Sequence, residues 1–438
     1  LDTTTRTLTI SGRGEMYDYD SHLSTPWADY ISSIISLYIE DGITSIGDCA
    51  FYYCRYLSNV NISNSVTHIG YMSFRNCSLV NITIPDSVTT IDDYAFQYCS
   101  YLENITMSSN ITNFGSNVFG QTKWYNNASN WENDMLYLGN LLLKVKPTVS
   151  GACEIKEGTT IICAKAFDYC EDITKIIVPD TLISIQDEAF SRCIKLKNLN
   201  IPSSVTEISS TAFLQCCNLI LSVDDSNKYY SSNDSGELLN KEKTQLLFTS
   251  MSGHSSGGIY SVPDGIVKIG EYAFSSNPIS GIYLFQINFP STLKEIGARA
   301  FCGVQVQNLV LPSSLVSIGE KAFCAGVGEN THLVLPDSLV TIGKEAFVFL
   351  NHINNPVNNL TIQQVKDIYL GKIISWHQVG GPLRLINPLT RPEASGSQSV
   401  MNSFMKTSTY TKKPLQVFGS SIGFSFRFYV EDLVGNSK

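Results

Sequence analysis

The sequence predicts a β/α solenoid, an array of about eleven units of roughly 23 residues that stack into one elongated core. Three observations predict it: a regular spacing of phenylalanines, a strand-like segment before each of them, and the length of the chain. At 438 residues the chain is too long for a single compact core. With 43% apolar and only 16% charged residues, it nevertheless has the composition of a folded protein.

A phenylalanine that usually follows a small residue recurs at nearly constant intervals in three blocks. The spacings are 23, 22 and 23 residues in the first block, 23 and 23 in the second, and 27, 22 and 24 in the third. Such a period indicates units that stack on their neighbours, because one unit alone cannot bury its apolar face. The eleven positions are Phe51, Phe74, Phe96, Phe119, Phe167, Phe190, Phe213, Phe274, Phe301, Phe323 and Phe347.

One unit, residues 79–99, shows what each turn contains. The segment from Asn81 to Ile84 alternates polar and β-branched residues, which predicts a short strand. Pro85 ends this strand because proline has no N–H to donate. We then expect a turn and a short helical segment that packs back onto the strand, with an apolar side formed by Val88, Ile91, Ala95, Phe96 and Cys99.

Two longer intervals interrupt the period. Residues 124–144 and 223–248 each read as strand, polar turn, strand, with Gly139-Asn140 and Asn240-Lys241 near the turns. The pattern predicts two irregular repeats that carry hairpins. These repeats could be plain scaffold or could contribute to partner binding, and the sequence leaves both alternatives open.

Six of the twelve cysteines share one position, three residues after a repeat phenylalanine. We expect them to stack as a ladder of buried thiols, a role in which free cysteine acts as a small hydrophobe. Cys216 with Cys217, or Cys153 with Cys163, remain alternatives for a disulfide. No C-x-x-C pair or His-x-x-x-His spacing occurs, so we expect no metal and no cofactor. The six ladder positions are Cys54, Cys77, Cys99, Cys170, Cys193 and Cys216.

Composition and motifs argue against several functional classes. The sequence contains no H-E-x-x-H, no nucleophile elbow and no glycine-rich phosphate loop followed by lysine, so we do not expect an enzyme. A net charge of −9 disfavours nucleic acid as a partner. No apolar stretch approaches the roughly 20 residues that cross a bilayer, so we expect no membrane insertion in this chain.

The repeat L-x-x-I-x-I-P-x-S-V-x-x-I-G-x-x-A-F-x-x-C resembles the BspA-like leucine-rich repeats of many bacterial surface proteins. The match is close at residues 173–193 and 196–216, and the resemblance covers about residues 30–350. It implies a secreted or cell-surface bacterial protein that binds an extracellular protein or glycan, including host-derived ones, on its exposed strand face. It also implies a hairpin cap over residues 1–36, before a solenoid over residues 37–351.

After Phe347 the period stops, and residues 356–438 predict a small α/β appendage. Residues 360–372 read as a helix. The segments 360–382 and 391–397 resemble the PstS-like phosphate-binding proteins of uptake systems. Since a serine-glycine-serine run before a helix suits an anion, this resemblance implies phosphate contacts from Arg391, Ser395, Gly396 and Ser397.

The contacts that the family makes from its first lobe have no match in this sequence, so the resemblance implies only half of a two-lobed site. The alternative function is therefore phosphate binding by the tail. The competing interpretation is a remnant that covers the exposed core of the last repeat.

Overall fold

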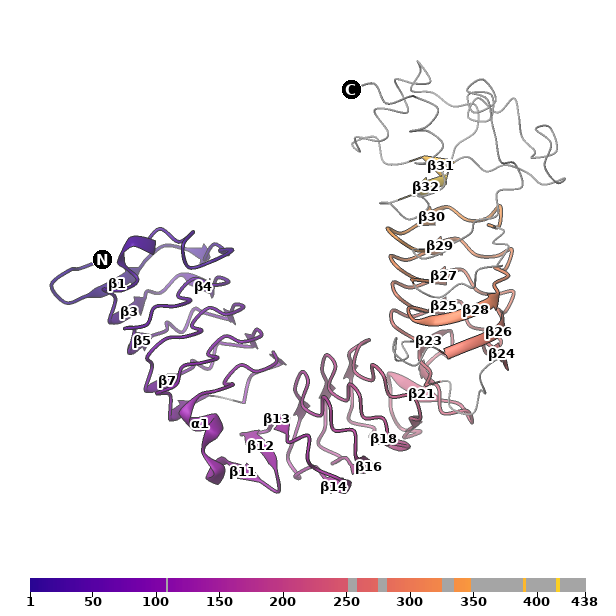
Figure 1. The fold of residues 1–438 in the computed structure, drawn as a ribbon, viewed down its shortest axis with the longest axis horizontal. Coiled ribbons are helices and arrows are strands. Elements are labelled where there is room, and N and C mark those ends of the chain that lie inside the picture. Colours follow the sequence, from indigo (N-terminus) through magenta and orange to yellow (C-terminus); the bar gives the residue numbers. More distant parts are fainter. Residues whose placement is uncertain are drawn as a thin grey trace, which may run out of the picture. The chain divides into compact units, whose positions relative to one another are not determined.

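The computed structural model describes residues 1–107, 109–250, 258–274, 282–324 and 335–347, together with strands at Leu389–Thr390 and Leu415–Val417. The chain divides into two compact units. Unit 1 comprises Leu1–Leu196 and Asn200–Phe213, and unit 2 comprises Lys197–Leu199 and Leu214–Lys438. Each unit is a stack of β-coils (Figure 1), and the chain is a β-solenoid of about 12 turns.

The first half of unit 1 has two parallel ladders, one strand of each ladder per coil. One ladder contains β1 (Thr7–Ile10), β3 (Ser36–Ile39) and β5 (Asn59–Asn61), followed by the pair β7 (Asn81–Thr83) and β9 (Asn104–Thr106). The other ladder is a five-stranded sheet of β2 (Gly14–Glu15), β4 (Ile43–Ile46), β6 (His68–Ile69), β8 (Thr90–Ile91) and β10 (Asn113–Phe114). The sequence predicted the first ladder only.

The second half of unit 1 repeats this plan. The parallel strands β13 (Leu141–Val145), β15 (Ile161–Ile162), β17 (Ser184–Ile185) and β19 (Glu207–Ile208) form one ladder. Strands β14 (Gly151–Glu154) and β16 (Ile173–Ile177) pair in the other. Strand β18 (Asn198–Ile201) contributes residues to both units.

Unit 2 is built in the same way. After β20 (Ile220–Val223), its long sheet runs through β21 (Tyr230–Ser232), β22 (Leu238–Asn240), β23 (Gln245–Phe248), β25 (Lys268–Ile269), β27 (Glu295–Ile296), β29 (Ser317–Ile318) and β30 (Thr341–Ile342). The opposite ladder contains β24 (Gly258–Ser261), β26 (Ile282–Asn288) and β28 (Val304–Asn308).

The helical segment predicted in each repeat is wrong, and with it the β/α description. The helices of the described residues are α1 (Lys123–Asn126) and two 3-10 turns, Ala28–Tyr30 and Ala128–Asn130. In the coil of residues 79–99, Tyr94 and Tyr98 adopt left-handed φ angles of 61° and 59°, which a helix does not tolerate. The amides of Tyr94, Phe96 and Tyr98 donate to carbonyls of the next coil at 2.9 to 3.0 Å. The backbone is thus satisfied between coils rather than within a helix.

The repeat phenylalanines form continuous columns inside each unit. Neighbouring rings are stacked with centroids 5.0 to 5.6 Å apart in unit 1 and 4.3 to 5.3 Å apart in unit 2. All eleven rings are buried. The burial of aromatic area along a column holds successive coils together.

Glycine in the I-G part of the repeat allows coils to approach closely. A Cβ on Gly343 would lie 2.3 Å from the backbone nitrogen of Glu320, and one on Gly115 would lie 2.3 Å from that of Asp93. Any larger side chain would therefore separate the two coils.

Both hairpin-bearing irregular repeats are confirmed. In the first, β11 (Trp131–Glu132), β12 (Met135–Leu138) and β13 pair antiparallel. In the second, β21, β22 and β23 do the same. In each case the last strand of the hairpin also starts the next parallel ladder, so the insert is continuous with the solenoid.

The N-terminal segment differs from the expected hairpin. Strands β1 and β2 pair with β3 and β4 in parallel rather than with each other, so residues 1–36 form a further coil. Trp27 stacks on Phe51 with centroids 5.3 Å apart, and its indole N–H donates to the carbonyl of Ala50 at 2.9 Å. The tryptophan therefore covers the first ring of the phenylalanine column.

Two short strands of the C-terminal segment extend the long sheet of unit 2. Strand β32 (Leu415–Val417) pairs in parallel with β30, and β31 (Leu389–Thr390) pairs with β32. The predicted helix at 360–372 and the predicted phosphate residues Arg391, Ser395, Gly396 and Ser397 lie outside the described residues.

Candidate binding surface

The cysteine ladder lies in the interior and has no reactive character. The thiols of Cys77, Cys99 and Cys193 donate to the carbonyl oxygen of a phenylalanine in the preceding coil at 3.1 to 3.4 Å. Burial raises the pKa of Cys54 and of Cys170 to about 12, so neither forms a thiolate at neutral pH. Cys54, Cys77, Cys99, Cys170, Cys193 and Cys216 are all buried and free.

One disulfide joins Cys302 and Cys324, with a Cα–Cα distance of 4.8 Å. These two residues occupy the same position in successive coils, directly after the repeat phenylalanine. Both pairs that the sequence left open, Cys216 with Cys217 and Cys153 with Cys163, are free thiols. Within the described part of the chain, no group of three or more His, Cys, Asp or Glu side chains could hold a metal ion. No helix among the described residues is long and apolar enough to span a membrane.

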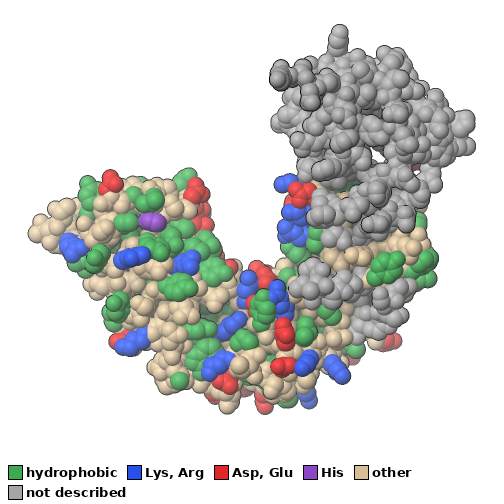
Figure 2. All heavy atoms as spheres, in the orientation of Figure 1, with side chains coloured by type: hydrophobic (Ala, Val, Ile, Leu, Met, Phe, Trp, Pro, Cys, Tyr) green, Lys and Arg blue, Asp and Glu red, His purple; other side chains and the backbone are tan. Residues whose placement is uncertain are grey.

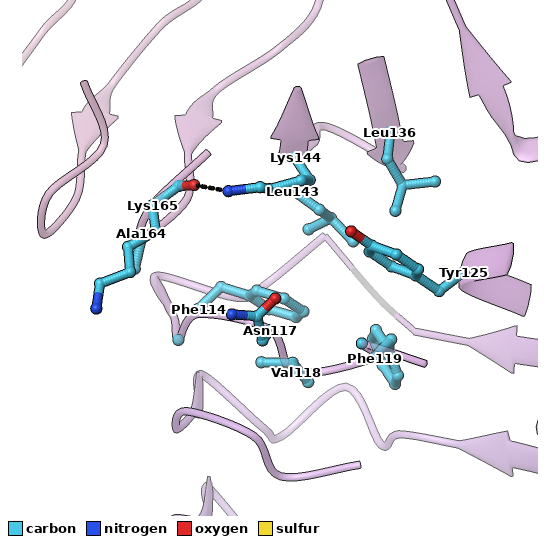
Figure 3. Close-up of a pocket in the computed structure, with 12 residues that line it drawn as sticks. Phe114, Asn117, Val118, Phe119, Tyr125, Leu136, Leu143, Lys144, Ala164 and Lys165 are labelled. Carbon is cyan, nitrogen blue, oxygen red and sulfur yellow. Dashed lines mark hydrogen bonds between the residues drawn. The ribbon is translucent and has the colours of Figure 1, made fainter. Parts of the chain in front are cut away.

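A small, partly open hollow lies beside the first irregular repeat, between Phe114, Phe119, Tyr125 and Leu143 (Figure 3). Its volume of about 20 Å³ suits roughly one water molecule, so it is too small for a substrate. Lys144 at its edge donates from Nζ to the carbonyl oxygen of Lys165 at 2.8 Å, and burial lowers the pKa of its ammonium group. The hollow therefore lies where the first irregular repeat packs against the neighbouring coils.

A group of tyrosines and arginines on the turns of unit 1 is partly exposed, with Arg55 and Tyr98 exposed and the other members half-buried. We call it the Tyr–Arg surface. Figure 2 shows Lys and Arg side chains beside hydrophobic ones, a class that includes tyrosine, over these N-terminal coils. The residues of the Tyr–Arg surface are Tyr52, Tyr53, Arg55, Arg75, Tyr94 and Tyr98.

Backbone geometry places these side chains at the surface. Tyr53, Tyr94 and Tyr98 have positive φ angles of 64°, 61° and 59°. They flank the buried Phe51 and Phe96 at positions two residues before or after the ring. The same left-handed turns that replace the expected helix therefore carry the aromatic side chains outward.

The arginines lie against tyrosine rings. The Cζ of Arg75 is 5.9, 5.9 and 5.3 Å from the ring centroids of Tyr52, Tyr94 and Tyr98. The Cζ of Arg55 is 4.6 Å from the centroid of Tyr53. These are cation–π distances, and they restrict the motion of long side chains that are otherwise flexible. The surface is thus ordered before any partner arrives.

The tyrosines also contact one another and a histidine. The rings of Tyr52 and Tyr53 meet edge to face with centroids 4.7 Å apart. His22 stacks on Tyr53 at 5.3 Å. Burial raises the pKa of Tyr52, while Arg75 opposes this effect, so its hydroxyl remains a hydrogen-bond donor at neutral pH. The Tyr–Arg surface therefore combines aromatic rings with hydroxyl groups that can donate hydrogen bonds.

The strand face, which the sequence favoured for binding, is polar at β7 and β9 and carries exposed apolar side chains elsewhere, among them Tyr38, Ile177 and Ile259. Asn104 Nδ2 donates to Asn81 Oδ1 at 2.7 Å, so neighbouring strands share an asparagine ladder. A shallow, open depression of about 650 Å³ lies where β3 and β5 end. Tyr38 pairs with Asn61 in the strand register there, beside Glu40, Asp41 and Asn64.

Sequence reasoning did not find the Tyr–Arg surface. A signal was present, because Tyr53 and Tyr98 lie two residues after Phe51 and Phe96, and Arg75 lies one residue after Phe74. Those positions were assigned to a helix, which would have spread them around its circumference.

Comparison with protein families identifies the repeats. A model described as BspA type leucine-rich repeat region matches residues 29–135, 152–234 and 256–369. The chain belongs to the BspA-type leucine-rich repeat family. A second model, a PBP superfamily domain, matches residues 318–423, which agrees with the resemblance of the C-terminal segment to phosphate-binding proteins. No curated protein matches the chain.

Several solved structures of bacterial leucine-rich repeat proteins are similar to the chain. A leucine-rich cell surface protein from Faecalibacterium prausnitzii is 21% identical, covering 78% of this chain and 82% of its own, with a TM-score of 0.37. The pneumococcal vaccine antigen PcpA is 15% identical over 86% of this chain and 85% of its own, with a TM-score of 0.34. A leucine-rich repeat protein from Bacteroides ovatus is 21% identical over 74% and 76%, with a TM-score of 0.27.

Proposed function

We propose that the chain is a secreted or cell-surface bacterial binding protein whose Tyr–Arg surface engages an extracellular protein. The observation that carries the proposal is the arrangement of Arg75 against three tyrosine rings. Tyrosine and arginine are, together with tryptophan, enriched at the energetic centres of protein interfaces. Ordering these side chains in advance lowers the entropic cost of binding.

Two further observations support a location outside the cell or on its surface. The BspA-type family to which the chain belongs is found in many surface proteins, and one similar structure is described as a cell surface protein. The disulfide between Cys302 and Cys324 suits an oxidising, extracellular environment.

An adhesion assay tests this function. Beads coated with the protein are applied to epithelial cells and to extracellular-matrix proteins, and bound beads are counted. We expect the double variant Tyr94→Ala, Tyr98→Ala to lose most adhesion, whereas Tyr229→Ala, which removes a 53% exposed tyrosine in unit 2, retains it. Equal adhesion of both variants and the wild type would show that the Tyr–Arg surface is not the binding site.

A glycan is a second candidate ligand, because the depression beside Tyr38 combines an exposed ring with carboxylate and amide groups. Sugar hydroxyls need such acceptors, and a tyrosine ring can stack on a sugar face. A glycan array tests it: signal that disappears in Tyr38→Ala and persists in Tyr98→Ala supports a separate glycan site, and no signal from the wild type rejects it.

Phosphate binding remains a proposal for the C-terminal segment, supported by the family model that matches residues 318–423. The pairing of β31 and β32 with the last coil supports the competing role, in which the segment closes the end of the solenoid sheet.

A further inference from the structure

We propose that the Tyr–Arg surface recognises an acidic polypeptide segment, whose Asp or Glu carboxylates bind to Arg55 and Arg75. This inference rests on the proposed function, since it names the chemistry of the partner at the same surface. It follows from the positive charges of Arg55 and Arg75, which no carboxylate of the described residues neutralises in an ion pair.

Arg55 and Arg75 have no acidic partner. Within the described part of the chain, the ion pairs join lysines or His68 to carboxylates, and neither Arg55 nor Arg75 takes part in one. In a chain with a net charge of −9, Arg55 and Arg75 bring two guanidinium groups without a carboxylate partner to the same group of tyrosine rings.

The nearby carboxylates are engaged by the backbone. Asp48 Oδ1 accepts a hydrogen bond from the amide of Tyr71 at 2.7 Å. Asp93 Oδ1 accepts one from the amide of Ser116 at 2.6 Å. These hydrogen bonds join successive coils, and within the described residues neither aspartate forms an ion pair with Arg55 or Arg75. The positive charge is therefore available to a partner.

The donors of Arg75 are largely unused. Its Nη1 donates to the sulfur of Met72 at 3.2 Å, a weak acceptor, and its buried Nε has no acceptor at all. A guanidinium is suited to two parallel hydrogen bonds with one carboxylate. The tyrosine rings hold the group in place, and because Nε is buried, a carboxylate from a partner would bind through the two Nη atoms.

The chemistry favours a polypeptide over a sugar. A neutral sugar can hydrogen-bond to the groups of this surface but brings no negative charge, whereas a carboxylate pairs with the guanidinium groups of Arg55 and Arg75. Glutamate and aspartate side chains supply a carboxylate for an arginine together with apolar methylene groups that can lie on a tyrosine ring.

The test uses the full chain and three soluble probes: a short glutamate-only peptide, the same peptide with glutamine, and polygalacturonate as a carboxylated polysaccharide. Fluorescence anisotropy measures affinity at low and at physiological salt. We expect the glutamate peptide to bind and the glutamine peptide not to bind. Arg75→Gln and Arg55→Gln should each weaken binding by about tenfold. The exposed Arg13, mutated to Gln, is the matched control and should have no effect.

A second variant separates a charge effect from misfolding. Arg75→Lys keeps the charge but cannot form the two-point contact, so it should bind with an intermediate affinity and melt at an unchanged temperature. Equal binding of the glutamate and glutamine peptides, or loss of affinity in Arg13→Gln alone, would overturn the inference. Tighter binding of polygalacturonate than of the peptide would overturn the choice of a polypeptide.

The two proposals fail in different ways. If Tyr94→Ala, Tyr98→Ala abolishes adhesion while no variant changes peptide affinity, the binding function stands and the acidic partner is rejected. If the variants change neither adhesion nor peptide affinity, both proposals are rejected.

Discussion

Phe96 illustrates how single residues hold the coils together. Its ring is fully buried between Phe74 and Phe119, with centroid distances of 5.2 and 5.5 Å. Removing it leaves a cavity that both neighbours line, and stacked coils cannot close such a cavity without breaking lateral hydrogen bonds.

We therefore expect Phe96→Ala to destabilise the first half of unit 1 by about 3–5 kcal/mol. Hydrogen exchange of the amides in residues 68–119 measures this loss locally. Phe285→Ala is the control, because that ring is 41% exposed and its loss should have little effect. Equal protection in both variants would contradict a stabilising role for the column.

His68 predicts a pH dependence. Its Nε2 lies 2.7 Å from Asp92 Oδ2, and this hydrogen bond raises the pKa of the imidazole above its ordinary value of 6.5. Since the folded pKa exceeds the unfolded one, the pair stabilises the fold fully below about pH 6.5, and the stabilisation is lost as the pH rises through the folded pKa.

The expected difference between wild type and Asp92→Asn is small, no more than about 1 kcal/mol, because both side chains are partly exposed. Melting temperatures measured across this pH range should converge on the alkaline side. A difference that grows with rising pH would show that the pair acts in the opposite sense.

At the scale of elements, the disulfide between Cys302 and Cys324 links two successive coils of unit 2 and closes a separation of 22 residues. We expect the double variant Cys302→Ser, Cys324→Ser to lower the free energy of unfolding of these coils by about 2–4 kcal/mol.

Reducing agent should lower the melting temperature of the wild type and leave that of the double variant unchanged. A wild type that is insensitive to reduction would show that the bond does not contribute to stability. The matched control is Cys217→Ser, which removes a free and partly exposed thiol.

Particular residues explain what the sequence could predict. The period of the phenylalanines predicted stacked units with a continuous core, and the polar turns near Gly139 and Asn240 predicted the two hairpins. The left-handed turns were not visible, because Tyr94, Lys165 and Glu188 adopt positive φ angles without being glycine. Lateral hydrogen bonds to the next coil compensate for that backbone cost, and an isolated repeat gives no sign of them.

The Tyr–Arg surface could not be predicted from the sequence for the same reason. Arg75, Tyr94 and Tyr98 come from two coils, and only the stacking of those coils brings the rings to the guanidinium. The disulfide partners also come from different coils. Their shared position after Phe301 and Phe323 is readable from the sequence, whereas their distance depends on the coil geometry.

At the scale of the whole molecule, two roles are proposed for the C-terminal segment, phosphate binding and closure of the end of the solenoid sheet. Titration calorimetry with inorganic phosphate should show no heat, and the melting temperature should stay unchanged at millimolar phosphate, if the segment only closes the solenoid sheet. Micromolar binding that disappears in Arg391→Ala and in Ser395→Ala would establish a phosphate site instead.

The lateral pairing of coils also has a mechanical consequence. Under tension each coil can peel from its neighbour independently, and a released unit of 23 residues, such as Phe51 to Phe74, would lengthen the chain by about 75 Å. Such a chain would yield stepwise under load and dissipate work at every step. The covalent link from Cys302 to Cys324 withholds 22 residues from this extension, so one segment of unit 2 would stay short after the coils on either side had unravelled.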